Sequence, residues 1–525
     1  MSGALTLGAL LRGVDGARVH GGTGSPLAAP PELPIAEVRD DSRLVGPGDL
    51  FVAVPGIKAD GAKFVGDAAA RGAAAIVVEG DAPPDLGAFP GVFVTVPRAR
   101  RALGVIATNR FGAAPAMTLM AVTGTNGKTT TTYIVEAMLR AAGRAPGVVG
   151  PVAYPAAGLP GGGRAAPLTT PGALMLHGLF AEMHAVGTSD VVLEATSHAL
   201  EQGRLDGCAF RVGALTNLTQ DHLDYHGDMG QYFDAKAILF ERLLEPARGV
   251  AVTFLDDEAG RQMRERAAAG GGRLGIARAP GRQAAGADIV VEKQTLGASG
   301  TRATLATPIG RLEIASPLVG EYNLSNLSTA VGMAVARGLP ADAIVAGAAG
   351  LAGVPGRLER VENRRGVLCV VDYAHTPDAL KRAIAAMRPL VAPGRRLIVV
   401  FGCGGDRDRG KRPLMGEIAA RDADLAIVTS DNPRTEDPDS IVAMILDGVR
   451  RAGAPALGAP ALAGAARGTY ADVDRRAAIQ AAAAAVGPGD VLLIAGKGHE
   501  DYQILGTTRI HFDDREEAAA ALAGA

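Results

Sequence analysis

A short segment in the first third of the chain combines glycines, a lysine and a threonine in a pattern that suits phosphate binding. Residues 121–130 read AVTGTNGKTT, an apolar run followed by a Gly-rich turn that ends in Lys128 and Thr129. Gly124 and Gly127 allow backbone N–H groups to point at an anion, and the following helix presents its positive N-terminal end there. Lys128 can neutralise the outer phosphates of a nucleotide, and the Thr129 hydroxyl can bind Mg²⁺. The segment therefore predicts a phosphate cradle, shorter than the general P-loop, rather than an ordinary Gly-rich turn.

A carboxylate and two histidines in the same part of the chain could complete a metal site. Glu194 ends the apolar run VVLEATSH, and Mg²⁺ prefers carboxylate and hydroxyl oxygens, so Glu194 and Thr129 form a plausible pair of ligands. The alternative for Glu194 alone is a helix-capping carboxylate. His222 and His226 lie four residues apart and could share one face of a helix. Taken alone, such histidines are more often hydrogen-bonded structural groups than metal ligands.

Polar residues in the last third of the chain follow apolar runs and suit an amino acid. Arg407, Asn432, Arg434 and Glu500 all lie just after such runs. Two arginines can hold a carboxylate in a bidentate fork, and Glu500 can face an ammonium group. A single arginine would fit a solvated surface equally well, but four polar residues at one sheet edge favour a binding site.

Seven short apolar runs that end in polar or glycine residues predict the strands that position these groups. They are LMAVTGTNGKT from Leu119, DVVLEATSH from Asp190, VGALTNLTQDH from Val212, VLCVVDYAHTP from Val367, RLIVVFGCGGDRD from Arg396, LAIVTSDNPR from Leu425 and DVLLIAGKGHED from Asp490. Continuous apolar strands that alternate with Ala-rich helical segments are typical of buried parallel sheets, which bind ligands at the carboxyl ends of their strands. The runs form two groups on either side of a Gly- and Pro-containing linker at GVPGRLERVE from Gly353. Shorter, turn-rich strands before residue 99 predict a smaller mixed domain.

The composition limits the class of protein. At 525 residues, the chain suggests about three domains, on a prior of roughly 150 residues per domain. A net charge of −2 gives no basic footprint for nucleic acid, which favours small-molecule partners. No apolar run approaches the roughly 20 residues that span a bilayer, so no membrane insertion is expected. Three scattered cysteines, Cys208, Cys369 and Cys403, fit core thiols in a reducing cytoplasm.

Taken in order, these motifs resemble those of the Mur ligases over nearly the whole chain. They are GTNGKTT, the TTP at Thr169, E-x-x-S-H at Glu194, TNLTQDHLDYHG, the asparagine pair Asn323 and Asn326, GRLE at Gly356, DYAHTP at Asp372, DNPR at Asp431 and GKGHED at Gly496. The resemblance implies a small mixed α/β N-terminal domain that holds a uridine nucleotide (1–98). It further implies a central P-loop-type ATPase domain with a mostly parallel sheet (99–354) and a Rossmann-like C-terminal domain (355–525).

The resemblance also implies an activity. Within the family, DNPR with GKGHED points to the addition of meso-diaminopimelate to UDP-N-acetylmuramoyl-L-alanyl-D-glutamate in peptidoglycan synthesis, through an acyl phosphate made with ATP and Mg²⁺. A cytoplasmic monomer is expected. The alternatives are a lysine-adding relative, another amino-acid ligase such as folylpolyglutamate synthetase, or a P-loop ATPase that acts as a nucleotide-dependent switch. The N-terminal DDSR motif argues against folylpolyglutamate synthetase.

The family roles carry over to four groups of residues. The implied catalytic residues are Lys128, Glu194, His222 and Lys236, and the implied Mg²⁺ ligands are Thr129, Glu194, His222 and Lys236 as its carbamate. The implied ATP site comprises Gly124, Thr125, Asn126, Gly127, Lys128, Thr129, Thr130, Asn323, Arg357 and Asp372. The implied UDP-sugar-peptide site comprises Asp40, Ser42, Ile57, Lys58, Ala59, Thr169, Thr170, Thr196, Gln202 and Arg204. The implied diaminopimelate site comprises Arg407, Asp431, Asn432, Pro433, Arg434, Gly496 and Glu500.

Carbamylation of Lys236 has a physical requirement that the sequence alone cannot test. The reaction needs the neutral amine, and a lysine with a pKa near 10.4 in water becomes neutral at physiological pH only when its pKa is lowered by desolvation. The product would be a negatively charged oxygen ligand that joins His222 at a second Mg²⁺, whereas an unmodified ammonium would repel the ion. The alternative is a lysine on the surface of a helix.

Overall fold

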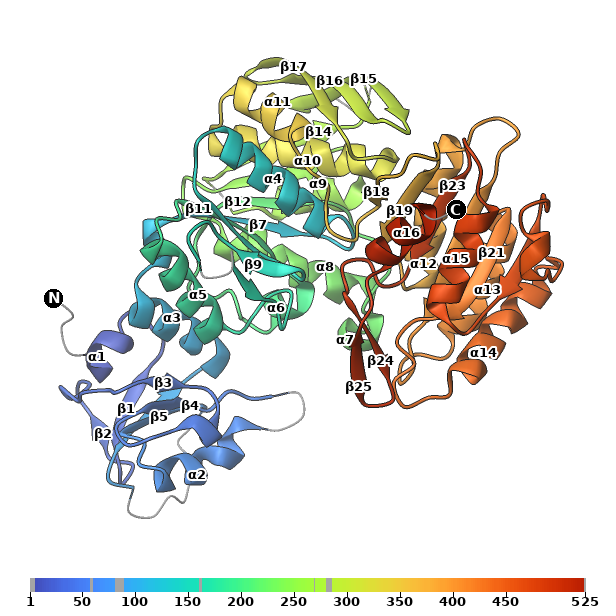
Figure 1. Cartoon of the computed structure of the whole chain (residues 1–525). Helices are drawn as coiled ribbons and strands as arrows, with labels where there is room; N and C mark the ends of the chain where they lie inside the picture. Colours follow the sequence, from blue (N-terminus) through green and yellow to red (C-terminus); the bar gives the residue numbers. More distant parts are fainter. Residues whose placement is uncertain are drawn as a thin grey trace. The chain divides into compact units, whose positions relative to one another are not determined.

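Three large sheets follow one another along the chain, in the order that the sequence predicts (Figure 1). The computed structural model describes residues 5–56, 60–80, 89–159, 163–268, 270–279 and 286–523. By its internal contacts the chain divides into two compact units. Unit 1 comprises Met1–Glu292, Leu305–Leu312 and Asn326–Ala348, and unit 2 comprises Lys293–Thr304, Glu313–Ser325 and Ala349–Ala525. The domain boundaries after residues 98 and 354 stay predictions.

The N-terminal sheet is small and mixed, as expected. Its strand order is β2 (Pro26–Leu27), β1 (Arg18–Gly21), β6 (Val92–Val96), β5 (Ala75–Glu79), β4 (Leu50–Val52) and β3 (Val38–Arg39). Strands β3 to β6 pair in parallel, whereas β1 pairs antiparallel with both β2 and β6. The helices of this part are α1 (Leu7–Leu10), α2 (Val65–Ala70) and α3 (Ala99–Phe111).

The central sheet has nine strands and a parallel core. Its order is β17 (Gly310–Ser316), β16 (Gly300–Thr307), β15 (Ile289–Gly297), β14 (Gly272–Ala277), β13 (Val250–Phe254), β12 (Phe210–Leu215), β7 (Thr118–Thr123), β11 (Asp190–Glu194) and β8 (Pro146–Val149). Every pair from β8 to β15 is parallel. Five of the six residues of β7 are buried, as expected for a strand that is covered on both faces.

Helices on both faces of the central sheet explain why its strands are apolar throughout. The helices are α4 (Lys128–Ala141), α5 (Ala173–Ala185), α6 (Ser197–Glu201), α7 (Leu223–His226), α8 (Met229–Ile238), α9 (Glu258–Arg266), α10 (Glu321–Arg337) and α11 (Ala341–Ala349). Helix α4 contacts β7, β8 and β11. Leu119 and Ala121 of β7 pack in one core with Leu176 and Phe180 of α5, and alternate residues of a strand face opposite sides. A two-stranded antiparallel ribbon follows β8 along the chain and consists of β9 (Ala153–Pro155) and β10 (Gly163–Ala165).

The C-terminal sheet has the doubly wound arrangement expected of a Rossmann-like domain. Its order is β18 (Glu359–Val361), β19 (Leu368–Asp372), β23 (Val491–Ala495), β20 (Leu397–Cys403), β21 (Leu425–Ser430) and β22 (Gly468–Ala471). All pairs are parallel except that of β18 with β19. One face packs on α12 (Pro377–Met387), α13 (Lys411–Asp422) and α14 (Pro438–Arg451), and the other on α15 (Arg475–Ala485) and α16 (Asp514–Ala523). A hairpin of β24 (Tyr502–Leu505) and β25 (Thr508–His511) follows β23.

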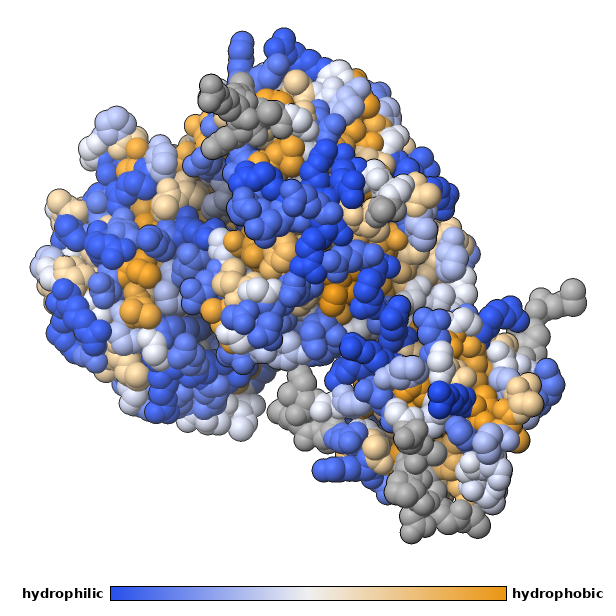
Figure 2. Space-filling model, turned by 180° about the vertical axis from the view of Figure 1, so that it is seen from behind, coloured by the Kyte–Doolittle hydropathy of each residue, from blue (hydrophilic) through white to orange (hydrophobic). Residues whose placement is uncertain are grey.

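The surface and the cysteines agree with the composition. All three cysteines are buried and free, which confirms the expectation of core thiols. Hydrophilic and hydrophobic residues are interspersed over the face shown in Figure 2. Within the described ranges, no helix is both long enough and apolar enough to cross a bilayer.

Candidate functional site

The predicted phosphate cradle is a strand–turn–helix whose two glycines are required by conformation and by space. Gly124 has φ +139° and Gly127 has φ +87°, a region that favours glycine. A Cβ at Gly124 would lie 2.0 Å from Thr216 Oγ1, and one at Gly127 would lie 2.1 Å from Asn326 Oδ1. The turn runs directly into the first residue of α4, Lys128. The structure thus confirms the local geometry that the sequence predicts.

The end of β12 holds the turn in place. Asn217 Nδ2 donates to the Asn126 carbonyl at 3.0 Å, and Asn217 Oδ1 accepts from the Asn126 N–H at 3.1 Å. Thr216 Oγ1 donates to the same carbonyl at 2.6 Å. Sequence reasoning missed Thr216 and Asn217 as loop supports, although both belong to the TNLTQDHLDYHG motif. Their hydrogen bonds fix the loop before any anion arrives.

Two lysine amines lie against this turn. Lys128 Nζ donates to the carbonyls of Gly124 at 3.0 Å and Thr125 at 2.9 Å. Lys236, on α8, is 1% exposed and also donates from Nζ to the Gly124 carbonyl at 3.0 Å. Its Nζ lies 4.3 Å from the centre of the Tyr232 ring. Lys236 is therefore a buried residue of α8 that contacts the turn, and not a surface lysine.

Burial makes the Lys236 amine easy to deprotonate. Desolvation, and secondarily the charge of Lys128, hold the pKa of Lys236 well below its ordinary value of 10.5. Both causes disfavour the ammonium form, because the surroundings offer little water and a second cation. The neutral amine that carbamylation requires is thus the form that the surroundings of Lys236 favour.

Glu194 lies at the sheet edge beside the phosphate turn. It is the last residue of β11 and pairs with Val122 on β7, two residues before Gly124. Its side chain is 2% exposed, and a Cβ at Gly150 would come within 2.9 Å of Glu194 Oε1. Parallel pairing therefore places the Glu194 carboxylate and the turn at the same edge of the sheet.

Four of the residues predicted to bind the peptide portion share one hydrogen-bond network. Thr170 Oγ1 donates to the Glu194 carbonyl at 2.6 Å and accepts from the Thr196 N–H at 3.3 Å. Arg204 Nη1 donates to the Thr170 carbonyl at 2.8 Å, and Arg204 Nη2 donates to Gln202 Oε1 at 2.7 Å. The network joins this group to the end of β11.

One member of the same network was not predicted. Gln202 Nε2 donates to the Tyr225 hydroxyl at 3.0 Å, and that hydroxyl donates to Glu201 Oε2 at 2.5 Å. Tyr225 belongs to the TNLTQDHLDYHG motif, which was the available signal. Thr169, the fifth predicted residue, precedes Thr170 and is half-buried.

The two histidines of the motif have different surroundings. Helix α7 begins after His222, which is its N-cap in a left-handed conformation with φ +53°, so the two residues do not both lie within the helix. His226 Nε2 lies 2.9 Å from Ser197 Oγ, a structural hydrogen bond. The His222 ring stands 4.9 Å from the His198 ring and 3.5 Å from a carboxylate oxygen of Asp221. His222 is the more accessible of the two.

The oxygen donors near the turn suit a metal ion that both the protein and the phosphates of a nucleotide bind. Among the residues described, no three His, Cys, Asp or Glu side chains form a metal-binding group. Mg²⁺ in nucleotide sites usually takes one or two protein oxygens and completes its shell with phosphate oxygens and water. The Thr129 hydroxyl and the Glu194 carboxylate match that requirement, and a carbamate on Lys236 would add a further oxygen donor.

The predicted amino-acid site gathers at strand ends of the C-terminal sheet. Arg407 follows β20, Asn432 and Arg434 follow β21, and Glu500 follows β23, and these strands are neighbours in the order β23, β20, β21. Asn432 Nδ2 donates to Glu500 Oε2 at 2.9 Å. Arg434, with φ +53°, donates from Nη1 to the Gly405 carbonyl at 2.8 Å. Arg407 is exposed.

Pro433 and Gly496, two further members of this group, lie where neighbouring backbone segments come into contact. Pro433 stands between Asn432 and Arg434, and its carbonyl lies so close to Gly405 that a Cβ there would come within 1.8 Å of the oxygen. Gly496 has φ +124°, and a Cβ at this position would lie 3.8 Å from the Asp431 carboxylate. The segment after β21 therefore lies tightly against the segment after β20 and in contact with the segment after β23.

Lys497 lies among these residues, and the prediction omitted it although the GKGHED motif contains it. It is fully buried, and its Nζ lies 3.3 Å from Asp431 Oδ1 and 3.1 Å from Asn432 Oδ1. Burial tends to raise the pKa of Asp431, but the charges of Lys497 and Arg475 outweigh it and hold this pKa below its ordinary value. Burial, together with the charge of Asp431, raises the pKa of Glu500.

Three residues predicted near ATP belong to unit 2, whereas the turn belongs to unit 1. Asn323 is 1% exposed and donates from Nδ2 to the Val319 carbonyl at 2.8 Å. The Arg357 guanidinium lies 5.0 Å from the centre of the Tyr373 ring. Asp372 accepts hydrogen bonds from the N–H groups of Leu358 at 2.8 Å and Ala374 at 2.9 Å, and burial raises its pKa.

The residues predicted to bind UDP are partly described. Ser42 opens a short 3₁₀ turn, Ser42–Leu44, and is 8% exposed. Asp40 precedes this turn, and burial raises its pKa. Ile57, Lys58 and Ala59 lie outside the described residues.

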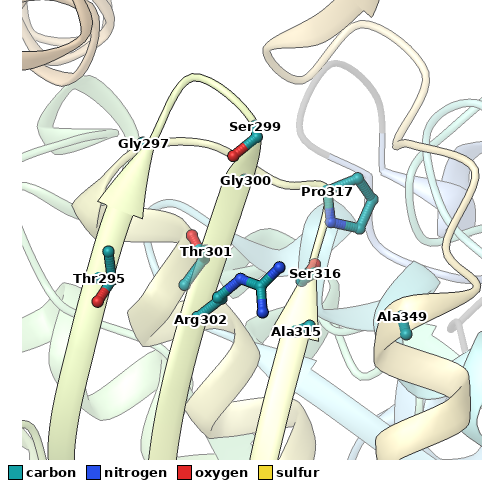
Figure 3. A pocket seen from close by; sticks show the side chains of 10 residues that line it. All are labelled: Thr295, Gly297, Ser299, Gly300, Thr301, Arg302, Ala315, Ser316, Pro317 and Ala349. Carbon is teal, nitrogen blue, oxygen red and sulfur yellow. The ribbon is translucent and has the colours of Figure 1, made fainter.

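A separate cavity lies at the ends of β15, β16 and β17 (Figure 3). Its volume is about 290 Å³, and Arg302, Ser299 and Ser316 are among the residues that line it. None of its lining residues belongs to a predicted site. This cavity is thus separate from the residues that the sequence predicts to bind substrates.

Comparison with known proteins defines the family. The model of the Mur ligase middle domain matches residues 122–334, that of the Mur ligase glutamate ligase domain matches 356–498, and that of the Mur ligase family catalytic domain matches 34–111. The chain belongs to the Mur ligase family.

Relatives of full length show the same resemblance. UDP-N-acetylmuramoyl-L-alanyl-D-glutamate–2,6-diaminopimelate ligase from Gloeobacter violaceus is 46% identical over 495 residues, with 94% of each chain covered. The protein of the same name from Geobacter metallireducens is 46% identical, with 93% of this chain and 94% of the relative covered. A solved structure of a ligase of this name has a TM-score of 0.68 and 34% identity, and covers 94% of this chain and 96% of its own.

Proposed function

We propose that this chain joins meso-diaminopimelate to the D-glutamate γ-carboxylate of UDP-N-acetylmuramoyl-L-alanyl-D-glutamate, with ATP as co-substrate and Mg²⁺ as metal, in peptidoglycan synthesis. The curated relatives carry the name of this ligase over almost the whole chain. The observation that carries the proposal is the grouping of Lys128, the buried Lys236 amine and Glu194 around one Gly-rich turn. Such a grouping suits a reaction in which two anions must meet.

The first step activates a carboxylate. A γ-carboxylate oxygen attacks the γ-phosphorus of ATP, the bond to the β-phosphate oxygen breaks, and ADP leaves with that electron pair, which gives an acyl phosphate. The backbone N–H groups of the turn and Lys128 bind the phosphates and lower the repulsion between the two anions. Mg²⁺, when bound by Thr129, Glu194 and phosphate oxygens, would supply further charge neutralisation. The hydroxyls of Thr170 and Thr196, next to Glu194, would orient the peptide.

The second step forms the amide. The neutral amine of diaminopimelate attacks the acyl carbon, the carbon–oxygen bond to phosphate breaks, and the amine loses a proton as inorganic phosphate leaves. Exclusion of water protects the acyl phosphate from hydrolysis, and correct placement of the amine supplies much of the rate. Arg407 and Arg434 would bind carboxylates of the amino acid, and Glu500 would face an ammonium group.

Lys236 would act as its carbamate. The neutral amine attacks CO₂, a carbon–nitrogen bond forms, and one proton leaves, so that a neutral amine becomes an anion that still carries one N–H. That N–H can keep the hydrogen bond to the Gly124 carbonyl. The carbamate oxygens would then join His222 as ligands of a second Mg²⁺.

The remaining roles belong to the same proposal. Asp40, Ser42 and Ile57 to Ala59 would contact the UDP portion, and Asn323, Arg357 and Asp372 would contribute to the ATP site. Domains at 1–98, 99–354 and 355–525 would then each bring one substrate. The protein would work as a monomer in the cytoplasm, a reducing compartment with which the buried free cysteines agree.

The test measures phosphate release with ATP, Mg²⁺ and the UDP-muramoyl-dipeptide, with meso-diaminopimelate, L-lysine or no amino acid, and confirms the product by mass. Turnover with diaminopimelate alone is expected. Turnover with lysine would favour the lysine-adding alternative. Phosphate release without any amino acid would favour an ATPase switch. Lys128→Met is expected to abolish turnover, and Lys293→Met, at an exposed position, serves as its control.

A further inference from the structure

Lys497 occupies the centre of a polar cluster at the carboxyl end of the C-terminal sheet. It follows β23 by two residues, yet its side chain is 0% exposed. Its Nζ lies 3.3 Å from Asp431 Oδ1, 3.1 Å from Asn432 Oδ1 and 3.9 Å from Glu500 Oε2. A lysine is almost never fully buried unless it is paired. The cluster therefore calls for an explanation beyond packing.

We infer that Lys497 is a positioning residue for amino-acid binding, which fixes the orientation of Asn432 and keeps Glu500 ready to receive a substrate ammonium group. The inference rests on the proposed function, because it assigns Glu500 to the amino acid. Lys497 itself is buried within the cluster and acts through Asn432 and Glu500. Its role is therefore distinct from that of a residue that touches substrate.

The orientation of Asn432 follows from its donors and acceptors. Asn432 Oδ1 accepts from Lys497 Nζ at 3.1 Å and from the Ile504 N–H at 2.9 Å. Lysine and backbone N–H groups can only donate, so the oxygen of the amide must face them. The Asn432 Nδ2 group is thereby directed at Glu500 Oε2, at 2.9 Å. A flipped amide would place an N–H group against two donors.

The charge of Lys497 balances the cluster. Asp431 and Glu500 are both acidic and lie close enough for the charge of Asp431 to raise the pKa of Glu500, while that of Lys497 lowers it. The groups that face Glu500 are Asp431 and Asn432 after β21, Tyr373 after β19, Lys497 beside it, Tyr502 on β24 and Arg475 on α15. Tyr373 donates a hydrogen bond to Glu500 Oε1 at 3.4 Å.

Loss of the Lys497 charge would remove the cation nearest to Asp431 and Glu500 and leave them only the charge of Arg475, which is paired with Asp514. Burial and the charge of Asp431 would then raise the pKa of Glu500 further. A protonated Glu500 attracts an ammonium group far less than a carboxylate does. Amino-acid binding would weaken first on the acidic side of the pH range, whereas ATP binding would be unchanged.

The experiment compares the wild type with K497M, K497Q, K497R and a matched control, R396M. Arg396 and Asp490 form an ion pair at 3.0 Å at the opposite edge of the same sheet, before β20 and β23. R396M therefore perturbs the stability of this sheet without touching the cluster. KM values for meso-diaminopimelate and for ATP are measured between pH 6.5 and 9.5, with thermal unfolding of each variant as a check on folding.

K497M is expected to raise KM for diaminopimelate about 10- to 100-fold, the size of one lost charged hydrogen bond, with KM for ATP unchanged. The acidic limb of its pH profile is expected to move upward by about 1 to 3 pH units. K497Q keeps a donor for Asn432 but removes the charge, so its acidic limb should shift in the same way. K497R, which keeps the charge, should restore the wild-type profile at least in part.

The outcomes separate this inference from the proposed function. If the wild type does not turn over diaminopimelate, the proposed function fails. If the wild type is active and K497M and K497Q match R396M in both KM values and in the pH profile, the positioning role of Lys497 is wrong. If KM for ATP rises as much as KM for diaminopimelate, the effect is a general structural one and the inference also fails.

Discussion

Replacement of Lys236 by methionine tests the proposed carbamate most directly, because it removes the amine but keeps an unbranched side chain of similar length. An amine of pKa 10.5 is about 0.1% neutral at pH 7.5, and each unit by which its pKa falls raises that fraction about tenfold. Burial and the charge of Lys128 lower the pKa of Lys236 well below 10.5. We therefore expect CO₂ to react with Lys236 in preference to an exposed lysine.

The same shift predicts how stability depends on pH. Between the folded pKa of Lys236 and 10.5, the unfolded chain binds one more proton than the folded chain, so stability rises with pH. The slope is at most about 1.4 kcal/mol per pH unit for one proton. K236M has no amine that can titrate at this position. In CO₂-depleted buffer it should therefore be more stable than the wild type at pH 7, and this difference in stability should shrink toward pH 10.

The assay has three parts. Urea unfolding at pH 7, 8 and 9 gives the stability difference between each variant and the wild type. A ¹³C NMR spectrum with ¹³C-bicarbonate should show a carbamate signal in the wild type and in the K293M control but not in K236M. Activity should fall when bicarbonate is removed, and short carboxylic acids should partly rescue a K236A variant, because they can supply the missing carboxylate.

Two results would refute this reasoning. A stability difference for K236M that does not vary with pH would mean that the buried amine is not neutral in the folded protein. Full activity of the wild type without CO₂, together with no carbamate signal, would show that Lys236 works unmodified.

Three further predictions concern other residues. Arg434→Ala should raise KM for diaminopimelate about 10- to 100-fold, the size of a lost charged hydrogen bond, and equal effects on KM for diaminopimelate and ATP would contradict the role assigned to Arg434. Gly127→Ala should lower the free energy of unfolding by about 1 to 2 kcal/mol for its left-handed backbone alone, and it should force Asn326 to move and raise KM for ATP. An unchanged KM for ATP would argue against a phosphate cradle at this turn. Asp514→Asn should lower the stability of the C-terminal domain by about 3 to 5 kcal/mol in urea unfolding, because Arg475 and Asp514 are both 0% exposed and paired at 2.7 Å. A loss of stability below about 1 kcal/mol would mean that water reaches the pair.

Local sequence was sufficient to predict the strands and the turn. Each of the seven apolar runs became a buried strand, because a strand that is covered on both faces has to be apolar along its whole length. The turn at residues 124–127 was equally evident, since glycines followed by Lys128 and Thr129 describe one continuous stretch of backbone. The assignment of Glu194, Arg407, Arg434 and Glu500 to strand ends followed from the same pattern, because polar groups after buried strands lie at one edge of a parallel sheet.

The sequence by itself determined which residues stand at the ends of strands, because periodicity and the positions of glycines act over a few neighbouring residues. Tertiary structure alone decided which of them meet. Asn217 braces a turn more than 90 residues away in the chain, Lys497 pairs with Asp431 and Asn432, and Lys236 is buried against Gly124. Burial and hydrogen-bond partners depend on which strands become neighbours, and that choice is made by packing across the whole sheet, which no short stretch of sequence contains.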